Sequence, residues 1–129
     1  MTETNAPVWP TMIASHRGGA MEWPENSPTA FHETAKLPVE MVEFDIHPSA
    51  DGELVVIHDA TLDRTTNGTG PVVAQSWAGL QQLTLQDTDG ERLLRLEELI
   101  EIFRPTDIML RLETKPGVGF KRYPGIELA

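Results

Sequence analysis

Three carboxylates in this sequence are spaced as ligands of a divalent cation would be. Glu43 and Asp45 are two residues apart in an apolar run, so both side chains point to one face if the run is a β-strand. Glu113 closes another apolar run. Like charges about 4 Å apart repel by roughly 4 kcal/mol at an effective dielectric constant near 20, and a bound cation removes that repulsion. Because oxygen is the only ligand atom, we expect a hard ion, Mg²⁺ or Ca²⁺, and not zinc.

The same carboxylates could be neutralised without a metal. One of them could be protonated, or could pair with Arg17, Arg111 or Lys115. The spacing alone leaves both interpretations open.

Two histidines and two cationic side chains accompany these acids. His16 and His58 are the candidate acid/base pair, because imidazole exchanges a proton near neutral pH. Arg17 and Lys115 are candidates for holding an anion, since the planar fork of arginine suits phosphate oxygens. The alternatives are histidines that bond only to the backbone and cations that only balance the carboxylates.

The clusters of ionisable residues follow or close four strand-like runs. Ionisable residues at the carboxyl ends of apolar strands are where an α/β barrel keeps its active site. The sequence therefore predicts that the strands bring these clusters to one end of a sheet. The runs cover residues 12–15, 39–44, 54–57 and 108–112.

Helical segments separate some of these runs. Asn26 or Ser27 is a suitable N-cap for the first helix, and Pro28 fits its first turn because the missing N–H costs nothing there. Pro105 should end the last helix. The predicted helices span about 28–37, 77–83 and 96–103.

A hairpin is predicted around Asp51-Gly52, a dipeptide typical of two-residue β-turns. In that register Asp45 lies opposite His58, so Glu43, Asp45 and His58 share one face. Pro48 could introduce a bulge and shift the register by one residue. The opposite face would carry Val42, Phe44 and Ile57.

The order of elements favours an α/β fold with a parallel sheet or barrel. We expect one domain over residues 1–129, with an insertion at about 47–90. Only about three β/α units fit in this chain, whereas a closed barrel needs eight, so we expect a fragment of a larger barrel.

Composition excludes several classes of protein. Acidic residues outnumber basic ones by 20 to 10, which argues against nucleic acid or an anionic membrane as a partner. The absence of cysteine excludes disulfides, zinc–thiolate sites and a cysteine nucleophile. We expect no stable membrane insertion, because no apolar run has the required length, and cytoplasmic localisation, because residues 1–10 lack a signal-peptide pattern.

Several motifs, in order, resemble those of the glycerophosphodiester phosphodiesterase family. The resemblance extends over about residues 12–127 and is more specific than any one motif alone. The matching segments include His16-Arg17-Gly18, Pro24-Glu25-Asn26-Ser27, Val42-Glu43-Phe44-Asp45-Ile46-His47, Val55-Val56-Ile57-His58-Asp59 and Leu112-Glu113-Thr114-Lys115-Pro116.

This resemblance implies a TIM-type (β/α)₈ barrel with a small hairpin and loop insertion after the second strand. It also implies metal-dependent hydrolysis of glycerophosphodiesters to glycerol 3-phosphate and an alcohol. The residues that match the family's functional positions are Glu43, Asp45 and Glu113 as metal ligands, His16 and His58 as the acid/base pair, and Arg17 and Lys115 as phosphate contacts.

Two alternatives remain at this point. A related barrel could act on lysophospholipids or sphingolipids, although no apolar rim or basic patch is evident in these residues. The chain could also be a non-catalytic fragment that binds a metal or a phosphodiester. Because an unclosed barrel leaves strand edges unpaired, we expect the isolated chain to be inactive, and either to self-associate or to be poorly stable.

Overall fold

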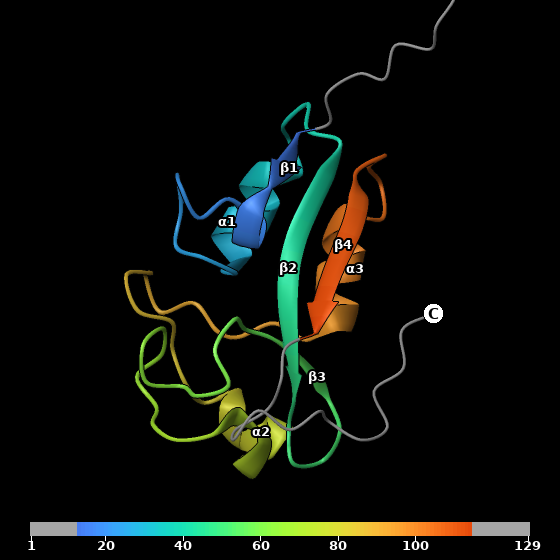
Figure 1. Cartoon of the computed structure of the whole chain (residues 1–129). Helices are drawn as coiled ribbons and strands as arrows, with labels where there is room; N and C mark the ends of the chain where they lie inside the picture. The colour runs from blue at the N-terminus through green and yellow to red at the C-terminus, as the bar shows by residue number, and fades with distance from the viewer. Residues whose placement is uncertain (1–12, 115–129) are drawn as a thin grey trace, which may run out of the picture.

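Strand β2 is the centre of a four-stranded sheet and carries most of the candidate site. The computed structural model describes residues 13–114. Strands β1 and β4 pair with β2 in parallel, and β3 pairs with its carboxyl end in antiparallel orientation (Figure 1). The elements are β1 (Ala14–Ser15), η1 (His16–Gly18), α1 (Pro28–Thr34), β2 (Met41–Pro48), β3 (Leu54–Val56), η2 (Val72–Ala74), α2 (Trp77–Leu80), α3 (Leu96–Phe103) and β4 (Met109–Thr114).

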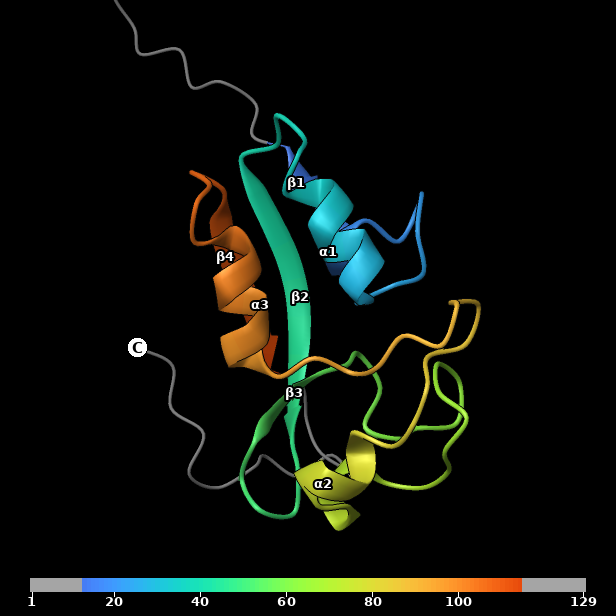
Figure 2. The same cartoon turned by 180° about the vertical axis from the view of Figure 1, so that it is seen from behind.

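Helices α1 and α3 cover the same face of the sheet (Figures 1 and 2). The even-numbered residues of β2 point to this face, and Val42, Phe44 and Ile46 are fully buried there. Phe31 joins the layers, because its ring meets those of Phe44 and Phe103 edge-on at 6.3 and 6.0 Å between centroids. Such edge-to-face pairs add stability beyond the buried area. The predicted α/β class with a parallel sheet is confirmed.

Helix α1 begins where the sequence predicts and ends one turn earlier. Ser27 is the N-cap, and its Oγ accepts a hydrogen bond of 3.1 Å from the Ala30 N–H. The helix ends at Thr34 and not at Leu37. The Leu37 N–H donates to the Thr34 carbonyl at 3.0 Å, so the chain tightens into an i→i+3 turn before Pro38.

The predicted hairpin register is wrong by one residue. His47 pairs with Val55, and Ser49 N–H donates to the Glu53 carbonyl at 2.8 Å, which leaves a three-residue loop. Gly52 in that loop has φ +85°, a left-handed conformation that suits three-residue hairpins. The residue numbers of each pair therefore add up to 102, whereas the predicted register, with Asp45 opposite His58, gives 103.

This shift changes two side-chain assignments. Asp45 does not face His58; instead its carbonyl accepts the Ile57 N–H at 3.0 Å. Ile57 does not join Val42 and Phe44 but packs in a second core, within the segment that follows β2. His58 lies beyond the end of β3, so its position depends on the loop and not on strand pairing.

The segment between β2 and α3 carries β3, η2 and α2, and α2 lies near the end of the sheet to which the arrows of β2 and β4 point (Figure 1). Ser76 caps α2, and that helix ends at Leu80 and not at the predicted residue 83. Trp77 and Leu80 bury themselves in the second core, which stabilises the segment beside the sheet. Among residues 13–114, no helix has the length and apolarity needed to cross a bilayer.

Candidate active site

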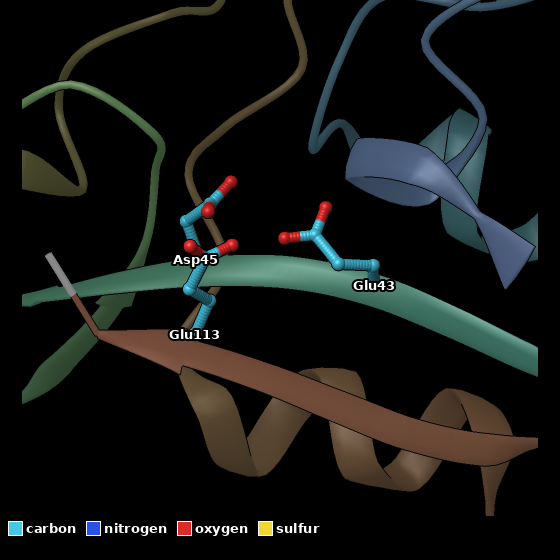
Figure 3. Close-up of side chains that lie close together, drawn as sticks. All are labelled: Glu43, Asp45 and Glu113. Atoms are coloured by element: carbon cyan, nitrogen blue, oxygen red, sulfur yellow. The ribbon is translucent and has the colours of Figure 1, made fainter.

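The three predicted carboxylates meet on the face of the sheet opposite α3 (Figure 3). Glu43 and Asp45 alternate along β2, and the parallel register places Asp45 beside Glu113 of β4. One carboxylate oxygen from each residue lies within 4.8 Å of the others. Glu43 is 8% exposed and Asp45 is 1% exposed, whereas Glu113 is exposed.

The electrostatics of this cluster disfavour the ionised form of Glu43 beside the other two carboxylates. Burial raises the pKa of Glu43, the Arg17 N–H that donates to it opposes the rise, and the neighbouring Asp45 carboxylate adds to it. Glu43 Oε2 is buried, and no N–H or O–H group within residues 13–114 donates to it. A buried acceptor of this kind is costly unless something positive meets it.

These residues fit a hard divalent cation. All donors are carboxylate oxygens, the set that Mg²⁺ and Ca²⁺ prefer. Two of the three ligands are fixed by one strand, and the third comes from the strand paired with it in register. The backbone thus holds Glu43, Asp45 and Glu113 close together, which is the arrangement that three ligands of one ion need.

The loop after β1 places His16 and Arg17 against this cluster. The Arg17 N–H donates to Glu43 Oε1 at 3.1 Å, and His16 Nε2 lies 3.6 Å from the same oxygen. Arg17 has φ +48°, in the left-handed region that non-glycine residues rarely adopt. Strained backbone of this kind persists where surrounding contacts enforce it, often at functional sites.

Close packing enforces that conformation. Gly18 has φ +72°, and a Cβ there would lie 2.7 Å from the Phe31 ring. The Gly18 carbonyl accepts the Thr34 hydroxyl at 2.7 Å, and the Arg17 carbonyl accepts the Asn26 N–H at 2.8 Å. Asn26, just before α1, and Thr34, its last residue, therefore both hold the His16–Gly18 turn in place.

His58 joins the site through the Arg17 side chain. Arg17 Nη2 lies 3.0 Å from His58 Nε2, although the two residues are far apart in sequence. His47, which is fully buried, donates through Nε2 to the His58 carbonyl at 2.8 Å. Burial lowers the pKa of His47, which keeps its ring neutral and suited to this structural contact.

Glu43, Glu113 and His16 line an open pocket of about 440 Å³. Ala14, Arg111 and Leu112 complete the lining. Arg111 is the register partner of Glu43, so a cation side chain also stands on this face. The pocket is of the size that small ligands occupy.

The structure brings together six of the seven predicted site residues: His16, Arg17, Glu43, Asp45, His58 and Glu113. Lys115 lies outside the described residues. Sequence reasoning gave no role to Glu25, Asp59 or Arg64. Glu25 contacts Arg17, Asp59 contacts His58, and Arg64 donates to both of these carboxylates. The adjacency of Asp59 to His58 was the available signal for one of them.

Known proteins resemble this chain in sequence. The sequence model of the glycerophosphoryl diester phosphodiesterase family matches residues 16–123. The chain is 37% identical over 122 residues to a glycerophosphodiester phosphodiesterase of Caldanaerobacter subterraneus. The aligned region covers 91% of this chain and 49% of that protein. A protein of the same name from Bacillus altitudinis is 33% identical over 123 residues, with 91% and 49% covered. The chain thus spans about half the length of these curated relatives.

Solved structures show the same similarity. A glycerophosphodiester phosphodiesterase from Agrobacterium tumefaciens superposes with a TM-score of 0.76 at 38% identity, covering 83% of this chain and 48% of that one. A phosphodiesterase from Oleispira antarctica, solved in complex with the product sn-glycerol-3-phosphate, gives a TM-score of 0.77 at 33% identity, with 84% and 46% covered. With the motifs, the carboxylate cluster and these matches in agreement, the chain belongs to the glycerophosphoryl diester phosphodiesterase family.

Proposed function

We propose that this chain supplies the metal-binding and acid/base residues of an enzyme that hydrolyses glycerophosphodiesters to glycerol 3-phosphate and an alcohol. The observation that carries the proposal is the meeting of Glu43, Asp45 and Glu113 on one face. His16 and Arg17 both approach Glu43, and Arg17 reaches His58, so acid/base groups and a cation adjoin the carboxylates.

The cofactor we propose is Mg²⁺ or Ca²⁺, held by the three carboxylates. When bound, such an ion would offset their mutual repulsion and polarise a phosphoryl oxygen of the substrate. The raised pKa of Glu43 supports this assignment, because its charged form needs compensation.

Arg17 and Lys115 would orient the phosphate. The Arg17 guanidinium is a quarter exposed, so it can reach a ligand while its backbone stays bonded to Glu43. Fixed donors around the phosphate stabilise charge that builds in the transition state. The assignment of Lys115 depends on its place in the matching motif.

The histidines would move the protons. One of His16 and His58 takes the proton of the attacking water, or of a neighbouring glycerol hydroxyl, as the new P–O bond forms. The other gives its proton to the alcohol oxygen as that oxygen's bond to phosphorus breaks. Each such transfer typically contributes about 10²–10⁴-fold to the rate.

A substrate in the glycerophosphodiester class is favoured over lysophospholipids and sphingolipids. The relatives described above carry glycerophosphodiester phosphodiesterase names, and the Oleispira structure holds sn-glycerol-3-phosphate. The pocket beside Glu43 is lined by His16, Arg111 and Glu113 as well as by apolar atoms, which suits a polar diester.

Turnover of glycerophosphocholine with Mg²⁺ or Ca²⁺ tests the proposal. The chain should be joined to the carboxyl-terminal half of the Caldanaerobacter relative, and glycerol 3-phosphate release followed. His16→Ala and His58→Ala should each lower kcat by about 10²–10⁴-fold while cation binding is retained. His32→Ala, on the exposed side of α1, is the matched control. Turnover like that of the unmutated protein in both site variants would refute the histidine assignment.

A further inference from the structure

His58 and four other ionisable side chains form a closed ring of hydrogen bonds. His58 Nδ1 lies 2.8 Å from Asp59 Oδ1, and Arg64 donates to both oxygens of Asp59 at 2.9 and 3.0 Å. Arg64 also donates to both oxygens of Glu25 at 2.6 and 3.1 Å. Arg17 closes the ring, with Nη1 3.3 Å from Glu25 and Nη2 3.0 Å from His58 Nε2.

The ring allows only one protonation state of His58. A guanidinium has no acceptor, so Arg17 must donate to His58 Nε2. An ionised carboxylate can only accept, so the proton on the imidazole must lie on Nδ1 and point to Asp59. Both neighbours therefore select the neutral Nδ1–H tautomer, in which Nε2 carries a lone pair.

Arg64 keeps the carboxylates of the ring in their acceptor state. Hydrogen bonds from Arg64 and His58 hold the pKa of Asp59 well below its usual range, against the opposing effect of burial. Burial would raise the pKa of Glu25, but the Arg64 hydrogen bonds and the charges of Arg64 and Arg17 lower it overall. Two bidentate contacts from one planar group also fix the spacing between Asp59 and Glu25.

We propose that Asp59, Arg64 and Glu25 are positioning residues that hold His58 in the Nδ1–H tautomer. His58 Nε2 is then the atom that accepts a proton. Arg17 donates to that atom until an anionic ligand binds the guanidinium instead. This assignment depends on the proposed function for its catalytic meaning, because it makes His58 the general base of the pair. The tautomer itself is a structural property that exists without turnover.

The decisive measurement is the tautomer of His58 in the ¹⁵N-histidine-labelled chain, read from long-range ¹H–¹⁵N correlations near pH 7.5. The chain has 4 histidines, and His58→Gln identifies the signal by its loss. We expect the two-bond pattern of the Nδ1–H form. An Nε2–H or doubly protonated His58 in the unmutated chain would overturn the proposal, whatever the variants do.

Asp59→Asn then tests the role of the ring. Arg64 Nε needs an acceptor, so the amide oxygen would turn to it and the amide nitrogen would face His58 Nδ1. The imidazole would be driven toward the Nε2–H form, in conflict with the Arg17 donor. Loss of the Nδ1–H pattern supports the proposal, and an unchanged pattern in the folded variant contradicts it.

Glu101→Gln is the matched control, because Glu101 forms an exposed carboxylate–guanidinium pair with Arg104 at 2.7 Å on α3, outside the ring. It should leave the His58 pattern unchanged. Neither result depends on activity: a chain with Nδ1–H His58 whose joined form hydrolyses no diester would refute the proposed function and leave this inference standing.

Discussion

Asp45 in β2 and Glu113 in β4 are register partners in parallel strands, so both carboxylates leave the sheet on the same face. Glu43, two residues earlier in β2, completes the cluster within 4.8 Å. Strand pairing, and not a flexible loop, thus brings like charges together. The fold itself therefore creates the repulsion that the proposed cation would offset, and the predictions below depend on this cluster and on the loops around it.

Glu43→Gln should stabilise the chain without metal and remove most of the stabilisation by metal. Burial raises the pKa of Glu43, so its charged form is disfavoured in the fold, and the amide removes that charge. A cation at about 100 times its Kd stabilises a folded protein by about 2.7 kcal/mol, and the variant should lose most of this gain. Thermal unfolding in EDTA and in Ca²⁺ or Mg²⁺ measures both effects.

Glu101→Gln serves as the control for that comparison, because the carboxylate of Glu101 is exposed on α3 and is not part of the cluster. It should show the same cation-induced shift as the unmutated chain. A Glu43→Gln chain that is less stable in EDTA yet keeps its full response to cations would contradict the account.

Acid should weaken the fold through the carboxylates of the ring. The pKa of Asp59 is lowered from an ordinary value of 3.8, and that of Glu25 from 4.5. For a lowered pKa, the contribution to stability is present above the unfolded value and is lost as pH falls through the folded value. The free energy of unfolding should therefore decline as pH drops below about 4.5.

Urea unfolding from pH 6 to pH 2 checks this sign. Asp59→Asn should be less stable than the unmutated chain at pH 6, and the gap should narrow as acid removes the same interaction from the unmutated chain. A gap that stays constant or widens toward pH 2 would show that Asp59 does not contribute in this way.

Gly18→Ala should be more damaging than Gly52→Ala. Both glycines have positive φ, and alanine there costs about 1–2 kcal/mol. At Gly18 the added Cβ would also lie 2.7 Å from the Phe31 ring, whereas at Gly52 nothing lies within 4 Å. Overpacking typically costs a further 1–3 kcal/mol or so. Equal urea midpoints for the two variants would mean that the His16–Gly18 turn is not held against α1.

Ser27→Ala should cost about 1 kcal/mol, the usual value of an N-cap. Ser27 is fully buried, accepts from the Ala30 N–H and donates to the Pro24 carbonyl at 2.7 Å. Ser76→Ala is the comparison, since Ser76 caps only the four-residue α2 and is exposed. We expect the smaller loss at Ser76 in urea unfolding, and the reverse order would contradict the role given to Ser27.

Local signals in the sequence sufficed for much of the fold. The alternation of Glu43 and Asp45 with apolar residues predicted their shared face, and the Ser27-Pro28 pair predicted the start of α1. These features depend on neighbours in the chain, which the sequence displays directly.

Features that depend on distant contacts could not be predicted in the same way. The hairpin register failed because Asp51-Gly52 is compatible with loops of two or three residues, and the hydrogen bond of Ser49 to Glu53 decides between them. Arg64 reaches Glu25, 39 residues away, and no local pattern indicates that pairing. The loop beyond β3 positions His58, so no local pattern in the sequence could predict the contact between His58 and Arg17.

Anomalous diffraction from crystals of the chain grown with Mn²⁺, as a substitute for Mg²⁺, would show whether a divalent cation binds between Glu43, Asp45 and Glu113. We expect one strong peak within bonding distance of all three carboxylates, and its loss in Glu43→Gln crystals. Crystals saturated with Mn²⁺ that show no peak between these side chains, or show peaks only elsewhere, would contradict the proposed metal site.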